Sequence, residues 1–194
     1  MIPKNTAKLV RFLLRNIEGY GYNANQIAKY LKISVGSSFK ILKDLERKRI
    51  VAAQRIGNAV NYNLNLDNPE AVKIGELLLL EEKRLLRGYA KLYSESLQEF
   101  QKGELIILFG SILTKKEFND VDVLFVTDKP REVHDFCQEV STIRTKPVVP
   151  LILKKEGLIK ELNNRKEAIV SLIKEGVILK GESVFIEVIK NAKQ

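Results

Sequence analysis

The stretch LFGSILTKKEFNDVDVLFV, residues Leu108 to Val126, holds the pattern that decides the fold of the C-terminal half. The apolar run from Leu105 to Phe109 predicts a buried strand, and Gly110 tolerates the backbone angles of a sharp turn into a helix. Ser111 can cap that helix. Its hydroxyl and the first free N–H groups of the helix would then surround one point, an arrangement that suits a phosphate.

Two carboxylates open the second apolar run of this stretch. Asp120 and Asp122 are two residues apart at the start of a strand that reaches Val126, so their side chains leave the same face, while Val121 and Val123 point oppositely. Such a pair suits Mg²⁺, which takes oxygen ligands and keeps water or phosphate in its remaining positions. With a phosphate-binding turn facing it, the pair would orient a nucleoside triphosphate for in-line attack. The simpler alternative is a solvent-facing strand start with a turn at Asp120.

The order strand, Gly-Ser, short helix and Asp-x-Asp strand resembles the DNA polymerase β type nucleotidyltransferase superfamily, especially its minimal members. The resemblance covers about residues 104–153. It implies that Gly110 and Ser111 hold the triphosphate of the nucleotide. It also implies that Asp120 and Asp122 are catalytic and bind the divalent metal, Mg²⁺.

One departure from that family concerns a third carboxylate, which active members carry on a later strand. The matching strand here is expected in KPVVPLILKK, residues 146–155, which contains no acid. Glu156 follows it, and Asp135 and Glu139 fall on the preceding predicted helix, but the sequence places none of them beside Asp122. Loss of a general base or metal ligand costs a factor of about 10² to 10⁴ in rate. We therefore expect the domain to bind nucleotide and to turn over weakly or not at all.

The positive charge of the chain is confined to its first third. Residues 1–66 carry twelve Lys and Arg against three acids, which accounts for the whole formal charge of +9, while the remainder is balanced. A charge excess confined to one segment indicates a nucleic-acid or anionic partner for that segment. It also predicts a domain boundary near residue 66.

The hydrophobic pattern of this first third predicts three helices and a hairpin. Apolar residues recur at helical spacing from Leu9 to Ile17. Asn23 or Asn25 can cap a short second helix, and Ser34 can cap a third. Residues 51–56 and 59–65 then predict two strands joined at Gly57-Asn58, with one face in water.

This order resembles the winged helix-turn-helix domain over about residues 4–66. The resemblance implies that the helix beginning near Ser34 enters the major groove of double-stranded DNA and that the hairpin touches backbone or minor groove. Residues on the leading part of that helix would reach base edges, and later basic residues would reach phosphates. The DNA-binding residues expected in this way are Ser37, Ser38, Lys40, Lys43, Arg47, Arg55 and Asn58. The alternatives are a solvated charged face, or a winged helix that binds RNA or protein.

The segment from Glu70 to about Gln101 predicts one long connecting helix, or two helices joined near Gly88. Within it an apolar stripe repeats every seven residues. Its members are Leu79, Leu86, Tyr93 and Phe100, with Ala90 and Leu97 between them. Such a stripe is typical of a homodimer seam, which would suit a helix-turn-helix protein on a palindrome, and equally of a helix packed on a domain core.

The remaining features exclude several classes of site and protein. Cys137 is the only cysteine and His134 the only histidine, so an intramolecular disulfide and a Cys/His zinc cluster are excluded. A Cys/His nucleophile pair is conceivable, but a buried cysteine and a histidine in the capping turn of the helix explain the two residues more simply. The longest apolar run, Leu77 to Leu80, is far below membrane-span length. We expect no membrane association and a cytoplasmic protein.

The sequence as a whole predicts an α+β protein. We expect a winged helix-turn-helix domain at residues 1–66, a helical connector at 67–102, and a nucleotidyltransferase-like α/β domain with a small mixed sheet at 103–194. The function expected is DNA binding, as in a regulator of transcription, with a catalytically weak or inactive nucleotide-binding domain. The alternative is an active Mg²⁺-dependent nucleotidyltransferase that transfers a nucleoside monophosphate to RNA, protein or a small molecule.

Overall fold

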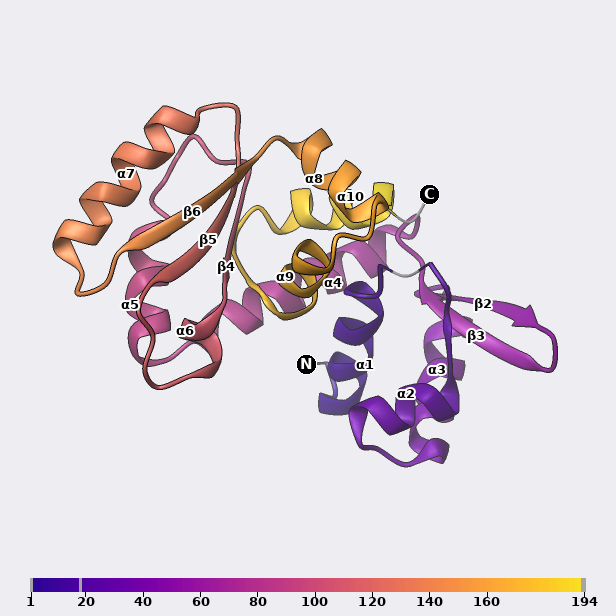
Figure 1. The fold of residues 1–194 in the computed structure, drawn as a ribbon. Helices are drawn as coiled ribbons and strands as arrows, with labels where there is room; N and C mark the ends of the chain where they lie inside the picture. The colour runs from indigo at the N-terminus through magenta and orange to yellow at the C-terminus, as the bar shows by residue number, and fades with distance from the viewer. Residues whose placement is uncertain (1, 18, 193–194) are drawn as a thin grey trace. The chain divides into compact units, whose positions relative to one another are not determined.

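The computed structural model describes residues 2–17 and 19–192, so Met1, Glu18, Lys193 and Gln194 lie outside it. The chain is a mixed α+β protein. It divides into two compact units, of which the first ends at Leu78 and the second runs Leu79–Ala192 (Figure 1). The segment expected as a connector over residues 67–102 is therefore shared between both units.

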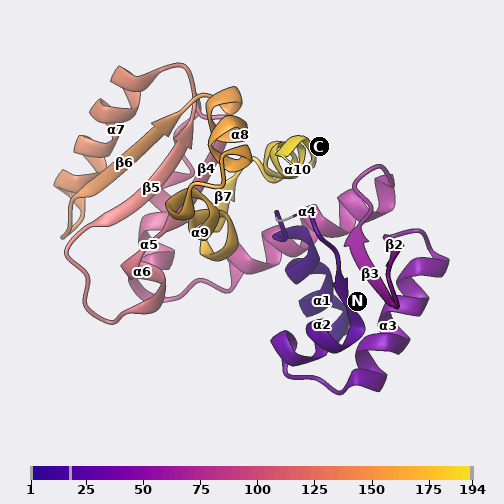
Figure 2. The same ribbon diagram turned by 45° about the vertical axis from the view of Figure 1, so that its right-hand side comes forward.

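The first unit contains the three helices and the hairpin expected from its sequence, together with a short additional strand. Its elements are α1 (Lys4–Leu14), β1 (Tyr22–Asn23), α2 (Ala24–Leu31), α3 (Val35–Arg47), β2 (Val51–Ile56) and β3 (Ala59–Leu64). The three strands form an antiparallel sheet in the order β1-β3-β2. α1 and α2 contact β3, whereas α3 contacts β2 (Figure 2).

Local residue chemistry sets the bounds of these elements. The Asn23 side chain accepts from the Gln26 N–H at 2.9 Å, and the Gln26 side chain accepts in return from the Asn23 N–H, so α2 begins in a capping box. The Ser34 hydroxyl accepts from the Ser37 N–H at 3.1 Å and caps α3 as expected. Gly57 takes a φ of +59° in the hairpin turn, where glycine carries no steric cost.

Apolar side chains from all three helices and from β3 fill the interior of the first unit. They include Leu9, Leu13, Ile27, Leu42 and Tyr62, all at most 2% exposed. The hairpin face that carries Val51, Tyr62 and Leu64 is the buried one, and the opposite face carries Gln54 and asparagines. The expected alternation of the hairpin is therefore confirmed over its inner part.

The helical segment that follows is broken into two helices, α4 (Pro69–Arg84) and α5 (Gly88–Leu97). Gly88, with a φ of +55°, lies at the break. The prediction of a single long helix is therefore wrong, and the alternative of two helices joined near Gly88 is confirmed. A residue with positive φ cannot continue an α-helix, which is why the chain changes direction there.

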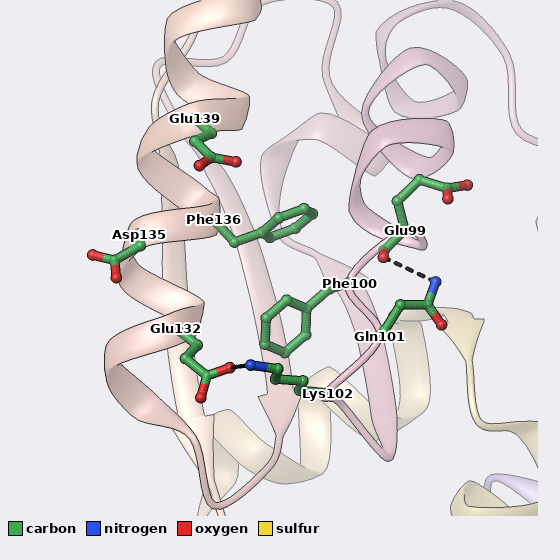
Figure 3. A pocket seen from close by; sticks show the side chains of 8 residues that line it. All are labelled: Glu99, Phe100, Gln101, Lys102, Glu132, Asp135, Phe136 and Glu139. Atoms are coloured by element: carbon green, nitrogen blue, oxygen red, sulfur yellow. Dashed lines mark hydrogen bonds and ion pairs between the residues drawn. The ribbon is translucent and has the colours of Figure 1, made fainter.

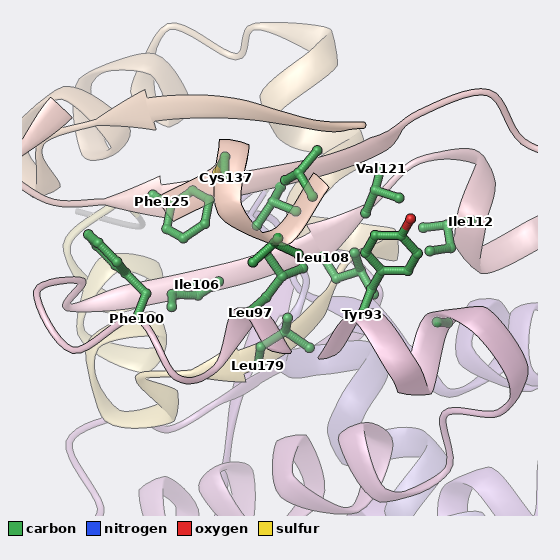
Figure 4. Packing of buried hydrophobic residues seen from close by; sticks show 14 of the residues in the cluster. Tyr93, Leu97, Phe100, Ile106, Leu108, Ile112, Val121, Phe125, Cys137 and Leu179 are labelled. Carbon is green, nitrogen blue, oxygen red and sulfur yellow. The ribbon is translucent and has the colours of Figure 1, made fainter. Parts of the chain in front are cut away.

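The seven-residue stripe of this segment belongs to the interior of the second unit. Its core cluster includes Leu86, Ala90, Tyr93, Leu97 and Phe100, and Leu79 is fully buried as well (Figure 4). The stripe therefore cannot form a seam between two copies of the chain. Helix–core packing and helix–helix pairing demand the same spacing of apolar residues, so the spacing alone did not separate them.

The second unit is built on a four-stranded sheet with the order β6-β5-β4-β7. Its strands are β4 (Leu105–Phe109), β5 (Val121–Val126), β6 (Val148–Leu153) and β7 (Val177–Lys180). β4 pairs antiparallel with β5 and β7, whereas β5 and β6 are parallel. The sheet is therefore mixed, as expected.

Helices cover both faces of this sheet (Figure 1). The helices after β4 are α6 (Ser111–Thr114), α7 (Pro130–Ile143), α8 (Lys155–Asn163), α9 (Glu167–Glu175) and α10 (Glu182–Ala192). Val121, Val123 and Phe125 of β5 lie in one core cluster with residues of α5 and α7 (Figure 4). The alternate residues Leu124 and Val126 are equally buried on the other face, which is the face of α8, α9 and α10.

Within residues 2–17 and 19–192, every helix is too short or too polar to span a lipid bilayer.

Candidate functional site

The Asp-x-Asp pair lies at the end of the sheet where β4 finishes and where β5 and β6 begin. Asp122 is paired with Phe109 on β4 and with Val149 on β6. Paired residues on neighbouring strands point to the same face, so these three side chains form one row across the sheet. Val121 and Val123 are fully buried on the opposite face, whereas Asp120 and Asp122 are partly exposed. The expectation that the two carboxylates leave the face opposite to the two valines is consistent with this burial.

Gly110 brings the turn after β4 directly against the Asp122 carboxylate. Its φ is +83°, and a Cβ at this position would collide with the carboxylate oxygen and lie 3.3 Å from the Asp122 Cβ. Only glycine therefore fits here, for reasons of both backbone conformation and space. The Gly-Ser turn and the Asp-x-Asp strand, ten residues apart in the sequence, meet at one point.

The prediction that Ser111 caps the following helix is wrong. Gly110 occupies the N-cap position of α6 without a side chain to offer, and Ser111 is already the first helical residue. A side-chain cap requires an extended residue before the helix, and the reversal at Gly110 takes up that position. The Ser111 hydroxyl is thus left next to the turn instead of bonding the helix end.

Partial burial and a like charge act together on the acid pair. Desolvation raises the pKa of Asp122 above its usual value, and the neighbouring Asp120 raises it further. Two carboxylates that repel one another are stabilised by a shared cation. The pair therefore offers oxygen ligands for one Mg²⁺, whose other positions would be filled by water or phosphate.

Replacing Asp122 by asparagine should stabilise the protein at neutral pH. A carboxyl whose pKa is raised by folding costs stability whenever it is ionised in the folded state. The gain in unfolding free energy for Asp122→Asn should be at most about 1 kcal/mol, because both carboxylates are partly solvated. It should shrink as the pH falls through the folded-state pKa and disappear below the ordinary value of 3.8. Urea unfolding across pH would measure it. The exposed Asp128→Asn is the control, and an equal gain in both variants would contradict the repulsion.

The residue beside Asp122 on β6 is a valine. Val149, directly beside Asp122, is 45% exposed. Glu156 follows β6 at the opposite end of the strands, since Leu153 pairs with Val126, and four residues of strand span about 13 Å. The acids of α7 lie over the other face of the sheet, the face of Val121 and Val123. Within the described residues, no group of three or more Asp, Glu, His or Cys side chains forms that could hold a metal ion.

Three acids of α7, Glu132, Asp135 and Glu139, line a separate hollow of about 360 Å³ (Figure 3). Phe100 and Phe136 form its floor, with ring centroids 5.1 Å apart. Lys102 and Glu132 form an ion pair at its rim. The remaining lining residues are Glu99 and Gln101. Asp135 and Glu139 therefore do not complete the acid pair on β5.

In the first unit, the expected DNA-binding residues of α3 fall on different sides of the helix. Ser38, Leu42 and Leu45 are its buried residues. Lys40, Lys43 and Arg47 are exposed, and their spacing places them on the side opposite to the buried residues. α3 is thus amphipathic, with a basic outer face.

The prediction that Ser38 contacts bases is therefore wrong. It is 0% exposed, and its hydroxyl has no hydrogen-bond partner among the described residues. The signal was present in the sequence, because Ser38 lies four residues before Leu42 and seven before Leu45, on the same helix face.

Ser38→Ala should raise the unfolding free energy by about 1 kcal/mol, since it removes an unsatisfied buried hydroxyl. A thermal or urea melt measures this change. Ser37→Ala, at a half-buried neighbouring position, is the control. A loss of stability in Ser38→Ala would show that the hydroxyl is satisfied.

Several of the basic residues are held by neighbouring groups. Lys43 Nζ bonds Glu46 at 2.8 Å, which raises its pKa, as does the nearby Tyr62 of β3. Arg47 bonds Asp44 at 3.3 Å. These are exposed pairs, which contribute little to stability and exchange readily for phosphate contacts. Lys40 has no ion-pair partner within residues 2–17 and 19–192.

The hairpin places its expected residues at the turn. Arg55 donates from Nε to the Gly57 carbonyl at 3.4 Å, and Asn58 is exposed at the tip. Arg55 pairs with Val60, on the same hairpin face as Tyr62, and Tyr62 lies beside Lys43 of α3. Arg55 of the hairpin and Lys43 of α3 therefore both lie on the hairpin face that carries Tyr62.

Two exposed apolar residues at the start of α3 were not expected from the sequence. Val35 is 49% exposed and Phe39 is 51% exposed. Lys43 Nζ lies 5.7 Å from the centre of the Phe39 ring. Residue type alone would assign both side chains to the core, and only the phase of the helix set by Leu42 and Leu45 could have indicated otherwise.

Cys137 should be inert toward thiol reagents in the folded protein. It is 3% exposed in the core of the second unit, and burial raises its pKa to about 12. Because the thiolate is the reactive form, alkylation by iodoacetamide near pH 8 should be slower than in denaturant by about 10² or more. Equal rates in both conditions would place the thiol at the surface. His134 is exposed on the same helix, so the two residues do not form a buried nucleophile pair.

The two candidate sites thus lie in separate compact units, an acid pair beside a glycine turn in one and a basic helix face in the other. Comparison of the chain with protein families, curated proteins and solved structures finds no match.

Proposed function

We propose that this chain is a DNA-binding regulator of transcription whose first unit is a winged helix-turn-helix domain. The observation that carries the proposal is the outer face of α3, where Lys40, Lys43 and Arg47 lie opposite the buried side of the helix. This helix follows a short capped turn, precedes a hairpin with Arg55 near its tip, and lies in the segment that holds the excess positive charge. The major groove of duplex DNA admits an α-helix, and a basic face on such a helix suits contacts to the phosphates.

For the second unit we propose a nucleotidyltransferase-like domain that binds Mg²⁺-nucleotide with little or no turnover. Gly110 against Asp122 supports a phosphate-binding turn beside the acid pair. Asp120 and Asp122 would hold one cation, and the Ser111 hydroxyl would contact phosphate. Val149 occupies the place beside Asp122 where an acid would complete the metal site. Two carboxylates with phosphate oxygens suffice to bind Mg²⁺, and the missing third group accounts for weak turnover.

An active nucleotidyltransferase is the second candidate. The raised pKa of Asp122, caused first by partial burial and then by the neighbouring Asp120, favours it, because carboxyl groups with perturbed pKa values are frequent at functional sites. Its expected reaction is transfer of a nucleoside monophosphate to RNA, protein or a small molecule, with the first unit positioning the acceptor.

The DNA proposal is tested by fluorescence anisotropy of a labelled duplex of mixed sequence at low salt. The full chain should bind, and Lys40→Glu should weaken binding by about tenfold or more, because it removes one phosphate contact and adds a repulsion. The matched control is Lys160→Glu, the same charge change on an exposed position of α8. Equal weakening by both variants, or no binding at all, would overturn the proposal. Preference for single-stranded or double-stranded RNA of equal charge would contradict it as well.

The nucleotide proposal is tested by incubating the chain with Mg²⁺ or Mn²⁺ and each labelled triphosphate. Binding without release of pyrophosphate is the expected result. Release that Asp122→Asn abolishes and Asp128→Asn preserves would establish the active enzyme instead. Absence of both binding and release would overturn both candidate roles and leave the acid pair as a strand start in solvent.

A further inference from the structure

The leading turns of α3 carry an unusual set of side chains for a helix that reads bases. Residues 34–43 contain no Arg, Asn, Gln, Asp or Glu. Asn and Gln are the usual partners of adenine, Asp and Glu accept from cytosine, and Arg is the commonest partner of guanine. Direct hydrogen bonding to base edges is therefore limited to Lys40, Lys43 and the hydroxyls of Ser34 and Ser37, since Ser38 is buried.

Two of the side chains that these turns expose are apolar. Val35 and Phe39 are each about half exposed and four residues apart, so they form one short strip on the helix. Gly36 and Lys40 form the adjacent strip, and a Cβ at Gly36 would meet nothing within 4 Å. The helix therefore presents an apolar strip beside a stretch of bare backbone, next to its basic residues.

The surrounding charge indicates which partner would cover this strip. Lys43 holds its ammonium group over the Phe39 ring, and Lys40 follows Phe39 directly. An apolar strip framed by cations suits a polyanion that also carries apolar groups. In the major groove of duplex DNA the one apolar group is the C5 methyl of thymine, and phenylalanine is among the side chains that contact it.

We propose that Val35 and Phe39 are the base-reading residues of this protein and that they recognise thymine methyl groups. This inference rests on the proposed DNA-binding function and adds its sequence preference. Ser37 and Lys40 supply the polar contacts beside the strip, with Lys40 suited to guanine. The absence of a side chain at Gly36 lets the helix backbone approach the groove closely.

The test removes the methyl group from the DNA and leaves its hydrogen bonds in place. Full-length protein first selects its best duplexes from a random pool, and those duplexes are then made with deoxyuridine in place of thymidine. Uracil pairs with adenine as thymine does but lacks the C5 methyl. Binding should weaken by about fourfold for each contacted methyl group.

Variants of Phe39 separate the methyl contact from other effects. Phe39→Ala should bind thymine duplexes more weakly and should narrow the difference between thymine and uracil duplexes, and the double variant Val35→Ala/Phe39→Ala should bind the two equally. Phe39→Leu keeps an apolar side chain and should retain most of the difference. Ile143→Ala, an exposed apolar position on α7 that is 77% exposed, is the control and should change neither affinity. Melting curves verify that each variant is folded.

The outcomes distinguish this inference from the function on which it rests. DNA binding that Lys40→Glu weakens, with equal affinity for thymine and uracil duplexes, would overturn the inference and leave DNA binding in place. A thymine preference that is undiminished in Phe39→Ala, or that remains in Val35→Ala/Phe39→Ala, would also overturn it. Failure of the chain to bind any duplex at low salt would overturn both, and the apolar strip would then be a surface for a protein partner.

Discussion

Raising the NaCl concentration from about 50 mM to about 200 mM should weaken duplex binding by about two orders of magnitude. The reason is the release of counterions from phosphates that the protein neutralises. Lys40, Lys43, Arg47 and Arg55 are the exposed cations on α3 and the hairpin. Four phosphate contacts predict a slope of about −3.6 in a plot of the logarithm of the association constant against that of the salt concentration.

Single cation deletions make this prediction specific. The side chain of Arg47 is 78% exposed and pairs weakly with Asp44. Arg47→Ala should therefore reduce the magnitude of the slope by about 0.9. Lys160→Ala, on α8, should leave the slope unchanged. Anisotropy titrations at four or more salt concentrations yield both slopes. A slope near zero for the unmodified chain would mean that its binding is not governed by phosphate contacts.

Val149→Asp should convert the two-acid site into a three-acid site. Val149 is paired with Asp122 and nearly half exposed, so an aspartate there meets solvent and the acid pair instead of a packed core. Restoring a metal ligand or general base corresponds to a gain of about 10² to 10⁴ in rate. Pyrophosphate release from labelled triphosphates with Mg²⁺ or Mn²⁺ measures this gain, and the affinity for Mn²⁺ should rise in parallel.

The matched control is Val149→Asn, which has the same shape as aspartate but no charge. It should leave both metal affinity and pyrophosphate release at the level of the unmodified chain. The free acid pair already repels, so Val149→Asp without metal should also raise the pKa of Asp122 further. A folded Val149→Asp with no gain in Mn²⁺ affinity would contradict a metal site at Asp120 and Asp122.

Local chemistry explains which parts of the fold were predictable from the sequence. The caps at Asn23 and Ser34 and the hairpin turn at Gly57 each depend on residues a few positions apart. Strands β4 and β5 followed from apolar runs bounded by Gly110 and Asp120. Interactions between residues a few positions apart can be recognised from the local sequence, and these were predicted correctly.

Two of the features that were not predicted depend on distant partners. The seven-residue stripe through Tyr93 fits a dimer seam as well as a core, and only the sheet that packs against it resolves the choice. The neighbour of Asp122 on β6 is set by the register of two parallel strands, which the sequence does not reveal. Ser38 differs, since its spacing from Leu42 and Leu45 already places it on the buried face of α3.

Gly110 and Val149 lie on either side of Asp122 but differ in how freely each can change during evolution. Any other residue at Gly110 would collide with the Asp122 carboxylate, so packing alone keeps the glycine in place even in a protein without catalysis. Val149 is partly exposed, so packing places a weaker constraint on it. In the genetic code, every valine codon becomes an aspartate or glutamate codon by one change at its second base. A single nucleotide therefore separates this gene from one that encodes a third acid beside the pair.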